Sequence, residues 1–103
     1  MSAPVDIRPI DLVRVWAVLD DALPTGAEVY VFGSRARGTG KRGSDLDLAV
    51  DAGRALTRDE AGRIADGFEE SDLPYTVDVL DLRAASATFK AVIARDRVDL
   101  PRP

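Results

Sequence analysis

Two aspartates separated by one residue, Asp45 and Asp47, open an apolar segment that continues to Val50. In an extended strand alternate side chains share a face, so both carboxylates point one way while Leu46 and Leu48 point the other way. Neighbouring carboxylates repel each other, and a divalent cation bound between them removes that repulsion because hard cations prefer carboxylate oxygens. The pattern therefore predicts a strand whose acidic end binds Mg2+.

The loop before this strand is basic and rich in glycine. Residues 35–42 of the loop contain no acid. They contain four cations: Arg35, Arg37, Lys41 and Arg42. The loop follows Gly33 and Ser34, which end an apolar run at 28–32 that predicts another strand. Gly33 allows a sharp turn close to a ligand, and Ser34 either contacts a terminal phosphate or only caps a short helix. Together these features suit a polyphosphate with Arg42 as the first-ranked contact, and a solvated basic loop is the simpler alternative.

A third carboxylate comes from the segment at 75–80, where alternation predicts a strand. Asp78 stands in its middle, where an unpaired carboxylate would be costly to bury, and a metal shared with Asp45 and Asp47 would remove that cost. Asp81 is the competing candidate. It falls at the end of the strand, where an acid more often caps a turn, so the sequence favours Asp78.

Helical spacing of apolar residues predicts a helix over 10–23, with Trp16 in the core and Asp11 toward solvent. A second helix should follow the capping box formed by Thr57 and Glu60. A third is predicted over 84–95, with three apolar residues facing inward: Phe89, Val92 and Ile93. Residues 1–9 are expected to form a loose lead-in, and 96–103 a mostly irregular tail with room for a short strand.

The order of these elements predicts an α/β fold. We expect a small mixed β-sheet with helices on one face and the three carboxylates exposed on the other. At 103 residues the chain is expected to be a single domain, 1–103, with one core and no second domain that would select a substrate.

Composition narrows the chemistry. The chain has no cysteine and no histidine, which excludes disulfides and most zinc sites, so any metal must be bound by oxygen. The net charge is −4, and stable nucleic-acid binding is not expected. No apolar run approaches the roughly 18 residues that a membrane span needs, and no signal-peptide pattern is present, so a cytoplasmic protein is expected.

The motif has a family resemblance. Gly33-Ser34, ten residues and then Asp45-x-Asp47 resembles the signature of the nucleotidyltransferase superfamily related to DNA polymerase beta. The fuller wording GSRARG…GSDLDLAV is similar to that of the minimal nucleotidyltransferases, or MNT proteins, which usually occur beside a HEPN partner. The resemblance runs from about Val29 to Leu82.

The resemblance implies two-metal transfer of AMP from ATP. Asp45 and Asp47 would hold Mg2+, two ions as in the family pattern, against the triphosphate. Asp78 would bind the metal that activates an attacking hydroxyl, or would act as its base. Gly33 and Ser34, aided by Arg35 and Arg42, would hold the departing pyrophosphate. These four residues and Ser44 would together form the nucleotide-binding set.

The resemblance also implies a partner. Larger family members select substrates with extra domains, whereas an MNT protein acts as an antitoxin that AMPylates a tyrosine of a HEPN ribonuclease toxin. A non-catalytic antitoxin that neutralises its partner by contact alone is the alternative, although such a module has no physical reason to keep a costly acidic cluster. A stand-alone transferase for a small molecule or an RNA end is disfavoured by the small size and the acidity of the chain.

Overall fold

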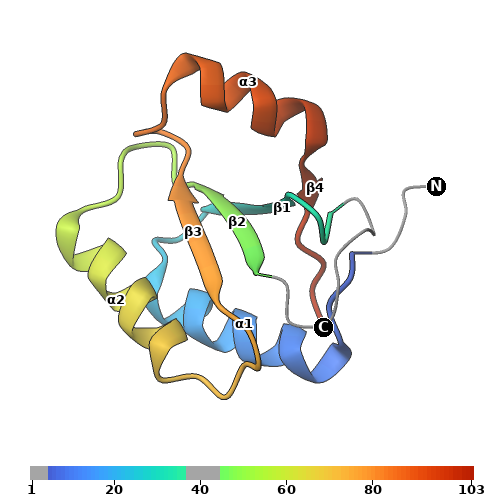
Figure 1. Ribbon diagram of the computed structural model, residues 1–103. Coiled ribbons are helices and arrows are strands. Elements are labelled where there is room, and N and C mark those ends of the chain that lie inside the picture. The colour runs from blue at the N-terminus through green and yellow to red at the C-terminus, as the bar shows by residue number, and fades with distance from the viewer. Residues whose placement is uncertain (1–4, 37–44) are drawn as a thin grey trace.

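The computed structural model describes residues 5–36 and 45–103, which form a four-stranded sheet and three helices (Figure 1). In chain order the elements are α1 (Pro9–Ala22), β1 (Glu28–Phe32), β2 (Leu46–Asp51), α2 (Arg58–Glu69), β3 (Val77–Asp81), α3 (Ala87–Asp96) and β4 (Val98–Asp99). The predicted α/β fold with a mixed sheet is confirmed. A short helix is expected after Gly33. The described residues that follow Gly33 there, 34–36, form a turn. No helix in the described ranges is long and apolar enough to cross a membrane.

The sheet has the strand order β3-β2-β1-β4. β1 is antiparallel to both β2 and β4, whereas β2 and β3 are parallel and are joined by α2, because a parallel pair requires a crossover connection. This topology gives β2 a neighbour on each side. Asp47 is thereby paired with Phe32 of β1 and with Asp78 of β3.

α1 and α2 cover one face of the sheet and enclose the main core. The buried side chains of this core include Leu12, Val15, Leu19, Val31, Leu46, Leu48, Val50, Ile64 and Phe68. Trp16 is buried as predicted, and its Nε1 donates to the carbonyl of Pro101 over 2.7 Å. The C-terminal segment is therefore held against α1.

α2 begins at the predicted capping box. The Thr57 hydroxyl accepts from the Glu60 N–H over 3.1 Å, and the Glu60 carboxylate accepts from the Thr57 N–H over 2.8 Å. Where α2 crosses α1, a Cβ on Gly67 would lie 2.6 Å from Val18 Cγ1. The glycine lets the two helices approach closely.

Asp11 is buried, which corrects the expectation that it faces solvent. Its carboxylate accepts from the Arg8 guanidinium over 3.0 and 3.2 Å and from the Tyr75 hydroxyl over 3.3 Å. These hydrogen bonds, that of Arg8 above all, hold the pKa of Asp11 below its usual value. The charge is buried with its partners, so it links α1 to the segment that leads into β3.

α3 lies on the face opposite α1 and α2, so the expectation of helices on one face holds for the first two and is wrong for the third. Its buried residue Ile93 packs beside Tyr30, Phe32, Ala49 and Leu80. Phe89 and Val92, which were predicted to face inward, are each 42% exposed. The apolar area on this face of the sheet is small, and it accommodates only one side of α3.

Candidate active site

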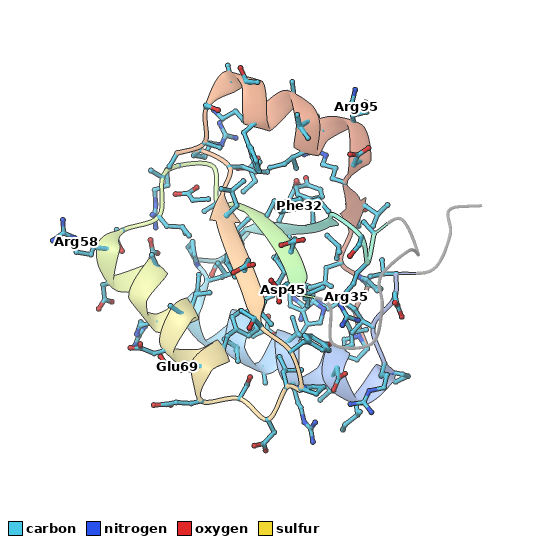
Figure 2. All side chains as sticks on the ribbon, viewed as in Figure 1. Phe32, Arg35, Asp45, Arg58, Glu69 and Arg95 are labelled. Atoms are coloured by element: carbon cyan, nitrogen blue, oxygen red, sulfur yellow. The ribbon has the colours of Figure 1, made fainter. Side chains whose placement is uncertain are left out.

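The sheet register brings two of the predicted carboxylates together. Asp47 and Asp78 are direct partners in the parallel β2–β3 pair, so their side chains leave the same face, the one that α1 and α2 do not cover. Asp45 precedes β2 by one residue and is exposed (Figure 2). Partial burial, followed by the charges of Asp78 and Asp45, raises the pKa of Asp47. Asp47 is therefore close enough to Asp78 and to Asp45 for their charges to oppose its ionisation.

This acidic group fits a divalent cation in its chemistry. All its donors are carboxylate oxygens, and their mutual repulsion is the kind that a bound Mg2+ relieves. Within residues 5–36 and 45–103, no three acidic side chains already converge into a formed metal site. A cation would therefore have to draw the three side chains together.

Asp78 is exposed, which corrects one step of the sequence argument. The alternation of this strand predicts an Asp78 carboxylate that would be costly to bury unpaired, yet the residue lies at the open face, where that cost does not arise. Asp81 has the structural role expected of it. Its carboxylate accepts from the Leu56 N–H over 2.7 Å and from the Arg83 N–H over 3.0 Å, so it caps two turns.

Gly33 brings the end of β1 against the carboxylate of Asp47. Its φ is +76°, and a Cβ there would lie 3.3 Å from Asp47 Cγ and inside van der Waals contact with Oδ2. Only glycine combines this backbone conformation with this close approach. Ser34 follows in the turn at 34–36, so the predicted glycine–serine turn lies directly beside the predicted metal-binding strand.

Arg35 lies in a different environment from the one predicted. It is 6% exposed, its guanidinium carbon lies 4.0 Å from the centroid of the Tyr75 ring, and its Nη1 donates to the carbonyl of Asp6 over 2.7 Å. The Asp6 N–H in turn donates to the Arg35 carbonyl over 3.2 Å. Arg35 thus fastens residues 5–7, expected to be loose, to the fold, and this burial argues against the phosphate contact predicted for it.

The other predicted basic and turn residues lie outside the described residues: Arg37, Lys41, Arg42 and Ser44.

Two aromatic residues that the sequence analysis did not place near the site border it. Phe32 is paired with Asp47 across β1 and β2, and its ring meets that of Phe89 edge-on, with centroids 6.2 Å apart and planes at 87°. The sequence does carry a signal that places Phe32 near the site. Phe32 directly precedes Gly33 at the end of a predicted strand, and this strand pairs with the acidic strand. The contact with Phe89 depends on where α3 lies, which the sequence pattern does not give.

Residues 25–100 match the family described as Polymerase beta, Nucleotidyltransferase, and the chain belongs to this family. The predicted superfamily is confirmed. Over 93 residues the chain is 38% identical to the probable protein adenylyltransferase MntA of Haemophilus influenzae, which covers 90% of this chain and 81% of that protein. Over 76 residues it is 37% identical to the protein adenylyltransferase MntA of Shewanella oneidensis, covering 74% of this chain and about half, 54%, of that protein.

The fold also matches solved structures. One is a crystal structure of a toxin-antitoxin with AMP-PNP, with a TM-score of 0.73, 29% identity, and coverage of 90% of this chain and 74% of that chain. Another, with a TM-score of 0.69 and 24% identity, covers 94% of this chain and 74% of that chain. It is described as a tri-AMPylated Shewanella oneidensis HEPN toxin in complex with MNT antitoxin, and it shares the fold.

Proposed function

We propose that this chain is a protein adenylyltransferase that transfers AMP from ATP to a hydroxyl, a tyrosine in the family pattern, of a HEPN ribonuclease toxin. By this modification it acts as the antitoxin of that toxin. The observation that carries the proposal is the in-register pair Asp47 and Asp78 on the open face of the sheet, next to Gly33. The MntA relatives and the AMP-PNP-bound toxin-antitoxin support it. The reaction consumes ATP, so we place the protein in the cytoplasm.

Asp45, Asp47 and Asp78 would hold Mg2+, and we propose two ions. When bound, Mg2+ supplies neutralisation of the triphosphate charge and lowers the pKa of the attacking hydroxyl. Gly33 would let the phosphates approach the backbone, and Ser34 would bind them through its hydroxyl and its N–H.

At the α-phosphorus the transfer breaks one bond and forms one, and the acceptor hydroxyl gives up its proton. The acceptor oxygen bonds to the α-phosphorus of ATP, the bond from that phosphorus to the bridging oxygen of the β-phosphate breaks, and pyrophosphate leaves. Asp78 would bind the metal ion that activates the acceptor hydroxyl, or would itself accept the proton of that hydroxyl. The roles of Arg42 and Ser44 at the phosphates remain predictions from the sequence.

The test is the intact mass of the cognate HEPN protein after incubation with this chain, ATP and Mg2+. The wild-type chain should add one or more AMP units, and Asp45→Asn/Asp47→Asn should add none. Asp51→Asn is the matched control, because Asp51 also lies on β2 but is paired with Arg83, Oδ1 to Nε being 2.8 Å. It should retain transfer.

The alternative is a non-catalytic antitoxin that acts by contact. It would be established if no nucleoside triphosphate gave a mass gain while the complex still formed and the toxin stayed silent.

A further inference from the structure

β3 lies at the edge of the sheet. Within the described ranges it pairs with β2 on one side, and no strand pairs with its other side. An edge strand presents backbone N–H and C=O groups that another extended chain can bind. The strand that carries Asp78 therefore has a side open to a second chain.

The register identifies which backbone groups face outward. The Leu46 N–H donates to the Thr76 carbonyl and the Leu82 N–H donates to the Val50 carbonyl, each over 2.9 Å. These two bonds lie at the two ends of the parallel ladder. Within the ladder, the backbone N–H and C=O groups of every second β3 residue point to β2. The backbone groups of Val77 and Val79, on either side of Asp78, consequently point away from the sheet.

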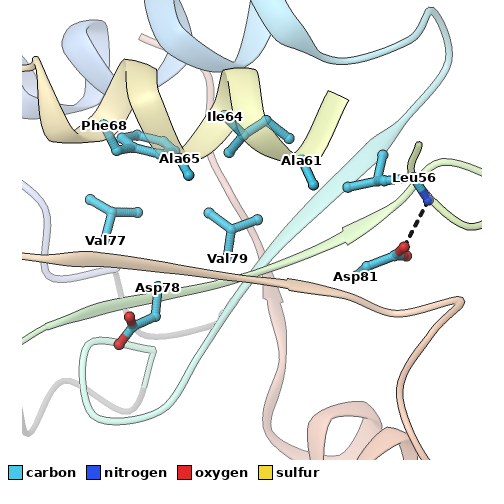
Figure 3. Close-up of a pocket in the computed structure, with 9 residues that line it drawn as sticks. All are labelled: Leu56, Ala61, Ile64, Ala65, Phe68, Val77, Asp78, Val79 and Asp81. Carbon is cyan, nitrogen blue, oxygen red and sulfur yellow. Dashed lines mark hydrogen bonds between the residues drawn. The ribbon is translucent and has the colours of Figure 1, made fainter. Parts of the chain in front are cut away.

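An apolar groove of about 290 Å³ runs along the same edge between α2 and β3 (Figure 3). Ala61 and Ala65 of α2 line one wall, and Val77 and Val79 point toward them from β3. Asp78 points to the opposite side of the strand, toward the open face. The edge thus offers apolar contacts on one face and the predicted catalytic carboxylate on the other.

The charge of the groove discriminates between occupants. The ionisable side chain on the groove side of β3, Asp81, is an acid, and Asp78 adds a second negative charge on the other face of the same strand. A second copy of this chain pairing through its own β3 would bring like charges together, which disfavours it. The groove instead suits an apolar segment that carries a cation.

We propose that an extended segment of the acceptor protein pairs with the outer edge of β3 and so presents its hydroxyl to Asp78. This inference rests on the proposed function and names how its protein substrate is bound. Strand addition of this kind obtains affinity from main-chain hydrogen bonds and specificity from pockets for alternate side chains. The groove is such a pocket.

The pairing defines the acceptor sequence. The residue opposite Asp78 has its side chain on the same face, with Cβ atoms about 5 Å apart, so this is the hydroxyl-bearing residue. Its two neighbours point to the groove, and both should be apolar. A lysine or arginine three positions from the acceptor residue would meet Asp81, whose side chain lies on the groove side.

Two substitutions block the edge in different ways. Val79→Pro removes an outward N–H and leaves the ladder to β2 intact, because proline is tolerated on an edge strand at such a position. Ala65→Trp fills the groove. Arg63→Trp is the matched control for it, since Arg63 lies on the same helix, is 61% exposed and points to the other side.

The readouts are steady-state transfer to the cognate HEPN protein and amide hydrogen exchange of β3. Val79→Pro and Ala65→Trp should raise the KM for the protein acceptor by about tenfold or more, which is the loss of about 1.4 kcal/mol of binding. Their KM for ATP and the behaviour of Arg63→Trp should match the wild type. Without ATP, adding the acceptor protein to the wild-type chain should slow exchange of the Val77 and Val79 amides.

Two results would overturn the inference. One is a wild-type acceptor KM in both folded edge variants, and the other is unchanged exchange of the Val77 and Val79 amides in the complex. The exchange experiment needs no nucleotide, so the two proposals fail separately. Protected amides in a complex that never gains AMP would overturn the proposed function alone, and AMP transfer with an unprotected edge would overturn strand pairing alone.

Discussion

Replacing Gly33 by alanine should damage the site more than the fold. The residue has a φ of +76°, a left-handed conformation that costs an L side chain about 1–2 kcal/mol. The new methyl group would also meet the Asp47 carboxylate, and moving that side chain off its rotamer costs about 0.5–1.5 kcal/mol. We expect Gly33→Ala to lower the free energy of unfolding by about 1.5–3.5 kcal/mol, and Tm by about 7–17 °C in a domain of this size.

Gly26 and Gly53 are matched controls because their φ values are +85° and +79° and a Cβ on either would meet no atom within 4 Å. Gly26→Ala and Gly53→Ala should lower the free energy of unfolding only by the cost of the left-handed backbone conformation, about 1–2 kcal/mol. Their AMP transfer should stay near the wild-type rate. Gly33→Ala should lose about 100-fold, because the displaced Asp47 no longer holds the reacting groups in position.

The assays are urea unfolding of the three alanine variants and the rate of AMP transfer to the cognate HEPN protein. The double variant Gly33→Ala/Asp47→Ala should recover most of the stability lost beyond the Gly53→Ala value, because the contacted side chain is gone. Equal stability and equal transfer rates for Gly33→Ala and Gly53→Ala would refute the close approach of β1 to Asp47.

Three further predictions concern stability. Gly67→Ala should lower the free energy of unfolding by about 1–3 kcal/mol, because its Cβ would lie 2.6 Å from a valine of α1. Gly62→Ala, with open space around it on the same helix, should raise it by up to about 1 kcal/mol, and urea unfolding measures both. Asp11→Asn should lower the free energy of unfolding most above the usual aspartate pKa. The difference from the wild type should shrink as pH falls through the pKa of Asp11, which Arg8 lowers. Measuring the free energy of unfolding across acidic pH would show this. The pKa of Asp47 is raised, so its ionisation destabilises the metal-free fold as pH rises through that pKa. Asp47→Asn should therefore raise Tm at pH 7 without Mg2+. The same variant should abolish AMP transfer.

Local patterns predicted what depends on neighbours in sequence. The Thr57 capping box lies within one turn of α2, and the alternation of β2 fixes which face carries Asp47. The position of Asp78 could also be predicted, because alternation and the family pattern agreed. The premise that burial made it costly was wrong, since alternation gives a face but not whether another element covers it.

The features that the sequence did not reveal depend on distant contacts. Asp11 is buried with a hydrogen bond to Tyr75, 64 positions away, so its helical position alone indicated solvent. Arg35 appeared to belong to a basic loop, yet the Tyr75 ring and the Asp6 carbonyl hold it. Periodicity identified an apolar side of α3 but not the small area of sheet available to it, which is why Phe89 is exposed.

The pairing of Asp47 with Asp78 makes the identity of the residue opposite Asp47 a discrete property of the sheet. Strand register changes only in whole residues, and a shift of one would turn Asp78 toward α2. A shift of two would place Thr76 or Leu80 opposite Asp47 instead. Core variants that keep the register should therefore keep Asp78 opposite Asp47, whereas variants that shift it should lose this pair completely.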